Sequence, residues 1–175
     1  TMSNESVLDK GLIKARKIAF EHIQKCLEDA CDDLVKHAQQ NYKSPIGSFT
    51  GNTITSYSVG LYIDGMFVYY YSDDGIKPPI RGKLTKKEGR VTLSPDWEGR
   101  TRSMYAKVDT DGGYGKDFAF DFLNSYKSKT KGMEIVMCTG TEYSSYIQDV
   151  LGGNVLTKTK DEAPSILMSN MKPMK

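Results

Sequence analysis

Residues 50–71 have the sequence TGNTITSYSVGLYIDGMFVYYY, and this stretch decides the fold. Two runs rich in β-branched and aromatic residues lie on either side of Asp64-Gly65. An Asp-Gly pair between two such runs predicts a β-hairpin, because the tight turns that join antiparallel strands need positive φ at residues that tolerate it. We therefore expect a hairpin within residues 50–72. Large aromatic side chains on both of its faces indicate that neither face is fully exposed to water.

A long amphipathic helix is predicted before the hairpin. Apolar residues recur at spacings of three and four, which places them in one stripe along a helix. The stripe consists of Leu8, Leu12, Ala15, Ala19, Ile23, Cys26, Ala30, Leu34 and Ala38. We expect one helix from about Ser3 to Asn41, in a helical segment of residues 1–43, with Gly11 weakening its first turns. Such a helix is about 50 Å long, so part of the stripe is expected to pack on the sheet and part on another subunit.

The rest of the chain predicts shorter elements. Residues 73–113 are expected to form an extended loop or a small β insertion, with strands at Val91–Leu93 and Met104–Val108. Residues 114–160 predict a helix–strand–helix core. Its expected elements are a helix from Tyr114 with Phe118, Ala119, Phe122, Leu123 and Tyr126 on one face, a buried strand at Met133–Cys138, and a helix at Glu142–Leu151 that ends at Gly152-Gly153.

The chain of 175 residues is expected to form a single domain, because its length does not suit a second full domain. Residues 161–175 are expected to be a tail in which a last helix starts at Asp161, with Pro164 in its first turn. The predicted fold class is α+β. It has a long N-terminal helix packed on a small, mainly antiparallel sheet, with two or three further short helices.

The composition argues against several classes of protein. The formal net charge is +2, from 24 basic and 22 acidic residues, which provides no global field for binding nucleic acid or an acidic membrane. Three cysteines, Cys26, Cys31 and Cys138, suit a reducing compartment better than a disulfide scaffold. No apolar run approaches a membrane span, and the first residues lack a signal-peptide pattern. We expect a soluble protein that contacts no membrane and is not secreted through the general pathway.

The candidate metal ligands and nucleophiles do not predict a site. His22, Cys26, Cys31 and His37 offer nitrogen and sulfur ligands for zinc, but along a straight helix they spread over more than two turns and more than one face. Cys138 has no histidine near it in the sequence, so a Cys-His pair would have to bridge the fold to the first helix. We predict no catalytic, metal-binding or cofactor-binding residue, and a protein that is not an enzyme. An enzyme that uses Cys138 with His22 or His37 stays an alternative.

Three other segments carry weaker signals. Asp109–Gly113 has the pattern that starts a calcium loop but lacks the later ligands, so a turn is expected. The glycines of residues 112–115, before Lys116, offer a phosphate cradle, although the P-loop spacing is absent. A basic cluster occupies the 73–113 segment and consists of Arg81, Lys83, Lys86, Lys87, Arg90, Arg100 and Arg102. We expect a solvated loop there, with contact to phosphate or to a partner as the alternative.

The order of these segments resembles that of one known family. The predicted long helix is followed by SFTGNTITSYSVGLYIDG at 48–65, GMEIVMC at 132–138, EYSSYI at 142–147 and GGNVL at 152–156. This order is similar to that of the tail-completion, or neck, proteins of long-tailed bacteriophages. In that family a first helix ends at Thr-Gly before an apolar strand, and a strand, a Tyr-Ala-containing helix and Gly-Gly-x-x-Val-Leu follow. Here Ser144 and Gln148 replace the usual alanine and glutamate, and Thr53-Ile54-Thr55 replaces the leucine-and-basic pattern. The resemblance covers Leu12 to Leu156 apart from the 73–113 segment.

The resemblance implies a virion structural protein of the neck or tail region that is assembled in the host cytoplasm. It would form a homo-oligomeric ring that joins the head connector to the tail and seals the DNA passage. The implied partners are further copies of the chain and the head-connector and tail proteins, with a non-specific contact to DNA in the channel as a further hypothesis. The alternative function is another non-catalytic phage assembly or adaptor protein, cargo-like or chaperone-like.

A ring of identical subunits needs two different contact patches. The surplus part of the helix stripe is one candidate. The other is the hairpin face that is expected to carry Tyr62, Phe67, Tyr69 and Tyr71. A second arrangement stays open, in which the long helix covers one face of the hairpin and the helix at residues 114–127 covers the other within a monomer.

Overall fold

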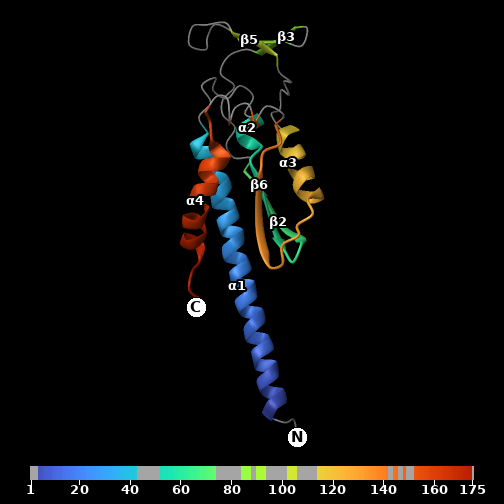
Figure 1. Cartoon of the computed structure of the whole chain (residues 1–175), viewed down its shortest axis with the longest axis vertical. Helices are drawn as coiled ribbons and strands as arrows, with labels where there is room; N and C mark the ends of the chain where they lie inside the picture. Colours follow the sequence, from blue (N-terminus) through green and yellow to red (C-terminus); the bar gives the residue numbers. More distant parts are fainter. Residues whose placement is uncertain are drawn as a thin grey trace.

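A computed structural model describes residues 4–42, 52–73, 84–87, 90–93, 102–105, 114–141, 144–145, 148 and 152–174. Its elements in chain order are α1 (Asn4–Asn41), α2 (Asn52–Thr55), β1 (Ser58–Ile63), β2 (Met66–Ser72), β3 (Leu84–Lys87), β4 (Arg90–Leu93), β5 (Arg102–Tyr105), α3 (Tyr114–Ser125), β6 (Met133–Cys138) and α4 (Val155–Asn170). Figure 1 shows α1 as a long rod beside the sheet of β1, β2 and β6, which confirms the predicted α+β class. Among the described residues, no helix combines the length and the apolarity needed to cross a bilayer.

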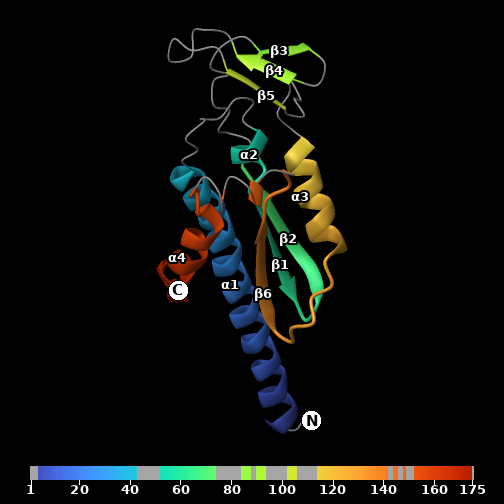
Figure 2. The same ribbon diagram turned by 45° about the horizontal axis from the view of Figure 1, so that its top comes forward.

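The main sheet is antiparallel throughout and has the strand order β2-β1-β6. The central strand, β1, is buried along its whole length. α1 packs on one face of the sheet with α4 beside it, and α3 packs on the other face, as Figures 1 and 2 show. Both faces of the hairpin are therefore covered within one chain, which is the second of the two arrangements that the sequence left open.

The hairpin forms at Asp64-Gly65, as predicted. Both turn residues have positive φ, 49° at Asp64 and 82° at Gly65, as a two-residue turn of the primed type requires. The backbone N–H of Asp64 donates to the Gly132 carbonyl oxygen at 2.8 Å, and the N–H of Gly132 donates to the Asp64 carboxylate at 2.8 Å. These two bonds fix the turn against the loop that enters β6.

Gly65→Ala is expected to lower the free energy of unfolding by about 1 kcal/mol, because alanine is strained at this positive φ. Its Cβ would also lie 3.3 Å from the Ser128 carbonyl oxygen. Urea denaturation at neutral pH measures the difference. Asp64→Asn is the matched control, because asparagine tolerates the left-handed conformation and keeps an oxygen for the Gly132 N–H. Equal stability of the Gly65→Ala variant and the native chain would contradict the turn geometry.

A β-bulge divides the aromatic residues of the hairpin between the two faces of the sheet. Leu61 pairs with Tyr69 but Tyr62 pairs with Phe67, so the register shifts between Leu61 and Tyr62. Such a shift reverses the alternation of side chains on the far side of the bulge. The prediction that one face carries all four aromatic residues is therefore wrong. Tyr62 and Phe67 face α3, whereas Tyr69 and Tyr71 pack against the core under α1.

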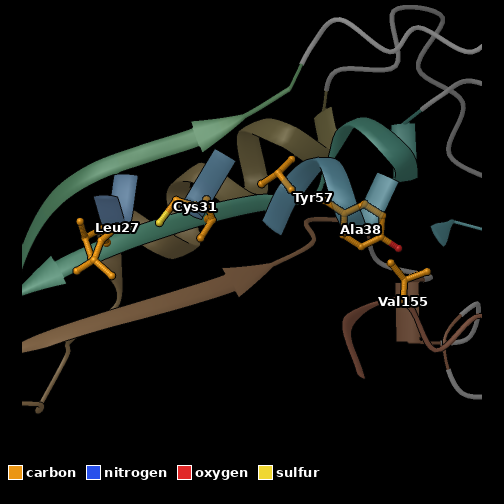
Figure 3. Close-up of a cluster of buried hydrophobic side chains, with 8 residues drawn as sticks. Leu27, Cys31, Ala38, Tyr57 and Val155 are labelled. Atoms are coloured by element: carbon orange, nitrogen blue, oxygen red, sulfur yellow. The ribbon is translucent and has the colours of Figure 1, made fainter. Parts of the chain in front are cut away.

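The main hydrophobic core lies between the C-terminal half of α1 and the sheet. Figure 3 shows Leu27, Cys31 and Ala38 of α1 with Tyr57 and Val155 in this core. The complete buried cluster is Leu27, Cys31, Val35, Ala38, Tyr57, Val59, Leu61 and Val155. The cluster takes all of its α1 residues from the C-terminal half, although α1 is one continuous helix through Gly11. The C-terminal half of the apolar stripe is thus the part that packs on the sheet.

Two predictions about burial need correction. β6 has the predicted bounds, but its residues are half-buried rather than buried, because β6 is an edge strand in the described part of the chain. On α3, Ala119 and Leu123 are buried, but Phe118 and Phe122 of the same predicted face are exposed. The side of α3 that lies on the sheet runs through Ala119, Phe120 and Leu123, because the Phe120 ring contacts Phe67 and Tyr70 of β2.

The last helix begins earlier than predicted. α4 starts well before Asp161 and contains Pro164 in its interior rather than in its first turn. Asn154, with φ at 49°, turns the chain into the helix, and the next residue, Val155, is buried in the core. Burial of the first turn therefore decides where α4 starts, and the expected boundary at residue 160 falls inside the helix.

A second, small sheet is antiparallel with the order β3-β4-β5. It lies apart from the main sheet, beyond the end at which α2 lies (Figures 1 and 2). β4 and β5 correspond to the predicted strands at Val91–Leu93 and Met104–Val108, of which residues 106–108 lie outside the described part. β3 was not predicted because its sequence, LTKK, has one apolar residue and no apolar alternation.

Candidate interaction surfaces

The N-terminal half of α1 presents a large apolar surface to solvent. In Figures 1 and 2, α1 extends beyond the end of the main sheet at which the hairpin turns. We name residues 7–23 the arm. The large apolar side chains of the arm are 42% to 67% exposed, and they are Val7, Leu8, Leu12, Ile13, Ile18, Phe20 and Ile23. Single apolar side chains on a surface are ordinary, but this many on one helical segment indicate a site of interaction.

An apolar groove lies between β6 and α4, with α1 as its floor. Its volume is about 610 Å³. The groove is lined by Leu27 and Leu34 from α1, Ile135 and Met137 from β6, and Leu156 and Leu167 from α4, among others. Lys160 supplies a positive charge at its side. Among the described residues β6 is at the edge of the sheet, and the half-buried side chains of β6 remain partly accessible in the groove.

Polar contacts hold α4 against α1 near both ends of α4. Near its start, Nδ1 of His37 lies 3.3 Å from Oγ1 of Thr159. At its end, Nδ2 of Asn170 donates to the Asp33 carboxylate at 3.0 Å. A hydrogen bond of this kind contributes about 1 kcal/mol. With both ends of α4 attached to α1, the walls of the groove are held in place.

Charged residues divide α1 into two regions of opposite sign. Residues 10–17 contain four basic residues and no acidic residue, and the four are Lys10, Lys14, Arg16 and Lys17. Residues 28–33 contain four acidic residues and no basic residue, and the four are Glu28, Asp29, Asp32 and Asp33. Leu27 and Leu34, which line the groove, flank this acidic region. The arm is therefore basic. The acidic residues project from the side of α1 opposite Leu27 and Leu34, and their partners include Lys25, Tyr69 and Asn170.

The aromatic residues proposed as the second contact patch have internal partners. Oη of Tyr62 donates to the Leu123 carbonyl oxygen at 2.5 Å, and burial raises the pKa of Tyr62 to about 12. The Tyr62 ring also stacks on Phe67, with centroids 5.2 Å apart. On the other face, Oη of Tyr69 donates to the Asp32 carboxylate at 2.6 Å, and burial together with this bond raises the pKa of Tyr69. These contacts fix the hairpin between α1 and α3.

The cysteines and histidines do not converge on a metal or catalytic site in the part of the chain that the structure describes. Nε2 of His22 lies 3.7 Å from Sγ of Cys26, but no group of three potential ligands occurs among the described residues. Cys31 lies in the core under α1, whereas Sγ of Cys138 donates to a carbonyl oxygen of α3 on the other face. Burial raises the pKa of each of these two thiols to about 12. Both are protonated at neutral pH, and a protonated thiol is a weak nucleophile.

The predicted phosphate cradle at Gly115 is a tightly packed junction. The N–H of Gly115 donates to Oδ1 of Asn52 at 2.9 Å. A Cβ on Gly115 would lie 2.8 Å from Cγ2 of Thr141, and a Cβ on Gly140 would lie 1.9 Å from the Gly115 carbonyl oxygen. The backbones approach so closely that a phosphate does not fit at Gly115. Sequence reasoning missed Gly140, whose only signal is a glycine soon after an apolar strand.

The other candidates lie wholly or partly outside the described residues. These are the calcium-like segment Asp109–Gly113, the helix predicted at Glu142–Leu151 apart from residues 144, 145 and 148, and Arg81, Lys83 and Arg100 of the basic cluster. The backbones of Lys86, Lys87, Arg90 and Arg102 lie in the small sheet. Lys87 and Arg90 are cross-strand partners there, so the topology brings basic residues together on this sheet.

The arm and the groove are apolar surfaces that one copy of the described chain leaves uncovered. Comparisons of the chain with protein-family models, with curated proteins and with solved structures return no match. The function is therefore inferred from the order of the sequence segments and from these two surfaces.

Proposed function

We propose that the chain is a non-enzymatic structural protein of the phage neck, of the tail-completion type. It forms a ring that joins the head connector to the tail and seals the DNA passage. The observation that carries the proposal is the ordered resemblance of helix, Thr-Gly hairpin, strand and Gly-Gly-x-x-Val-Leu to that family. In the fold these segments correspond to α1, the β1–β2 hairpin, β6 and the start of α4, which are parts of one α+β unit.

The two uncovered apolar surfaces support an assembly role. A closed ring of identical subunits needs a surface on one copy that fits a different surface on the next copy. The arm and the groove are two such surfaces, and they lie on different parts of the chain. Removing apolar area from water contributes about 25 cal/mol per Å², so covering both surfaces favours association.

The proposed partners are further copies of the chain on either side within the ring, the head connector at one end and the tail at the other. The basic residues of β3, β4 and β5 are the candidates for a non-specific contact with DNA in the channel, because phosphates are recognised by lysine and arginine regardless of sequence. The protein would belong to the virion and would be assembled in the host cytoplasm.

The proposal is tested by the assembly state of the purified chain, alone and mixed with the head connector or tail-tube protein encoded beside it. Light scattering gives the mass, and negative-stain microscopy gives the shape. We expect closed rings in at least one preparation, because a ring-forming subunit presents heterologous contacts that close. A strictly monomeric chain in every preparation would argue against a neck protein and in favour of an adaptor.

A further inference from the structure

We propose that the arms of two copies pair as an antiparallel two-helix coiled coil. The arm projects beyond the main sheet (Figures 1 and 2), so two arms can lie side by side with the rest of each copy at opposite ends. The contact goes beyond the proposed ring and does not rest on it. A pair with twofold symmetry closes on two copies, whereas a ring needs a contact that continues from copy to copy.

One face of the arm has the residue spacing of a coiled coil. Leu8, Leu12, Ala15 and Ala19 follow one another at alternating steps of four and three residues, which keeps them in a single row along the helix. We call these four residues the seam. Leu8 and Leu12 are 67% and 57% exposed, and Ala15 is exposed as well. The seam is therefore an apolar row that one copy leaves in contact with water.

The same face of α1 already carries a helix of opposite direction in its C-terminal half. The start of α4 contacts α1 at His37, and the end of α4 contacts it at Asp33. The chain after α4 then reaches His22, whose Nε2 lies 2.7 Å from the Lys172 carbonyl oxygen. Cys26, which continues the line of the seam, is buried there. The seam is thus the part of this face beyond these contacts, and an antiparallel arm would extend a packing that the chain itself uses.

The order of side chains in the seam favours the antiparallel pair. Leu8 and Leu12 are separated by the same step as Ala15 and Ala19. In opposite directions, Leu12 can therefore face Ala15 of the other copy while Leu8 faces Ala19. Each layer then joins one large and one small side chain, which lets the two helices pack evenly. A parallel pair in register would put leucine on leucine at one end and alanine on alanine at the other, which leaves a gap.

The charges beside the seam fit the same register. Asp9 and Arg16 lie on one flank of the seam. Both are exposed, and neither has an ion-pair partner among the described residues. In the antiparallel pair these flanks meet, and each Asp9 comes within about 3 Å, along the helix axis, of Arg16 of the other copy. The other basic residues of the arm point away from the seam and do not oppose the contact. They are Lys10, Lys14 and Lys17.

The apolar area of the seam suits a reversible dimer. The seam and the exposed Ile18 and Ile23 beside it supply on the order of 500 Å² per copy. The total of about 1,000 Å² is at the lower end of specific protein–protein interfaces, so we expect a dissociation constant in the micromolar range. A paired arm is covered. A ring that uses the arm as a contact would therefore form only after the pair has opened.

Cysteine cross-linking tests the direction and the register of the pair. Leu8→Cys and Ala19→Cys are made in separate full-length chains, mixed and oxidised. We expect a mixed disulfide-linked dimer, because the two new thiols face each other. Neither variant should cross-link alone, because two copies of the same cysteine lie about 16 Å apart along the helix axis in this register, too far for a disulfide. The native chain is the control, since Cys26 and Cys31 are buried and Cys138 is half-buried.

Sedimentation equilibrium of two neighbouring variants tests the seam. Leu12→Asp places a charge in the seam. Ile13→Asp is the matched control, because Ile13 is 66% exposed but points about 100° away from Leu12 around the helix, off the seam. We expect Leu12→Asp to weaken dimerisation more than tenfold, and Ile13→Asp to dimerise like the native chain. Circular dichroism establishes that both variants are folded.

A charge exchange tests the flank. Arg16→Asp is expected to weaken dimerisation severalfold, because it places two acidic residues side by side in the pair. Asp9→Arg in the same chain should restore the native affinity, since it returns opposite charges to both contacts. A double variant that dimerises no better than Arg16→Asp alone would contradict the register.

Three outcomes overturn the arm pair. These are a mixture of the cysteine variants that does not cross-link, a cysteine variant that cross-links with itself as well as with the other, and equal dimerisation of Leu12→Asp and Ile13→Asp. None of them bears on the ring, which is detected separately by microscopy. Rings without the cross-link would overturn the pair and keep the neck proposal, whereas cross-linked dimers with no ring in any preparation would keep the pair and overturn the ring.

Discussion

Gly140→Ala is expected to lower the free energy of unfolding by about 3 kcal/mol or more, a large share of the stability of an ordinary domain. The added Cβ would lie 1.9 Å from the Gly115 carbonyl oxygen and 2.5 Å from the backbone nitrogen of Ala119. Both are backbone atoms in the first half of α3, so no side chain can rotate away to make room. Either α3 or the segment after β6 must move, and urea denaturation followed by circular dichroism measures the loss.

Gly11→Ala is the matched control for this prediction. The same chemical change is made inside α1, where no heavy atom outside the helix itself lies within 4 Å of the new Cβ among the described residues. Alanine should raise the free energy of unfolding by up to about 1 kcal/mol there, because glycine is the poorer helix former. The two substitutions are thus expected to have opposite signs. A loss below about 1 kcal/mol for Gly140→Ala would mean that the two backbones are not in close contact.

The parts of the fold that a local rule decides were predictable from the sequence. The turn at Asp64-Gly65 can be predicted without the rest of the chain, since a primed turn depends on the φ preferences of two residues. The helix from Asn4 to Asn41 follows from the spacing of its apolar residues. Its length alone indicated that a small domain could not cover the whole stripe, and the exposed arm agrees with that argument.

The parts that depend on long-range packing were not predictable. Strict alternation placed Tyr62, Phe67, Tyr69 and Tyr71 on one face, but one extra residue at the bulge moves two of them to the other. The start of α4 depends on Val155, which is buried by α1 and β1 residues far away in the sequence. Gly140 is needed only because α3 crosses close to it, and no local pattern encodes a crossing.

The groove, which is part of the candidate site, was also not predictable from the sequence. Its walls come from α1, β6 and α4, three segments that are far apart in the sequence. Each contributes a row of apolar residues that a sequence pattern assigns to the core. Only the observed packing shows that Leu34, Met137 and Leu156 line an open groove instead of contacting one another fully. The arm could be anticipated from one segment, whereas the groove is built from three.

The folded chain is expected to lose stability steeply above pH 9. Burial raises the pKa of Cys31 and of Cys138 from an ordinary value of 9.0 to about 12. Between these values the folded state keeps both thiol protons while the unfolded state releases them. The stabilisation is therefore fully present below pH 9 and is lost as the pH rises toward 12. In this window the deprotonation of each thiol in the unfolded state lowers the free energy of unfolding by about 1.4 kcal/mol per pH unit. The two thiols together therefore lower it by about 5 kcal/mol between pH 9 and 11.

Urea denaturation at about pH 7, 9, 10 and 11 in the presence of a reductant measures this slope. Cys31→Ala is expected to be less stable than the native chain at every pH, because a buried sulfur atom is lost. Its free energy of unfolding should also fall less steeply with pH, because only about half of the thiol contribution to the slope remains. With Cys138→Ala as well, the remaining slope should begin only near pH 10, where tyrosines whose pKa burial raises, such as Tyr57, Tyr62 and Tyr69, start to contribute. The contrary result is a double variant whose free energy of unfolding falls with pH as steeply as that of the native chain between pH 9 and 10. It would show that neither thiol is shielded from water in the folded state. That is incompatible with a core that places Cys31 between α1 and the sheet.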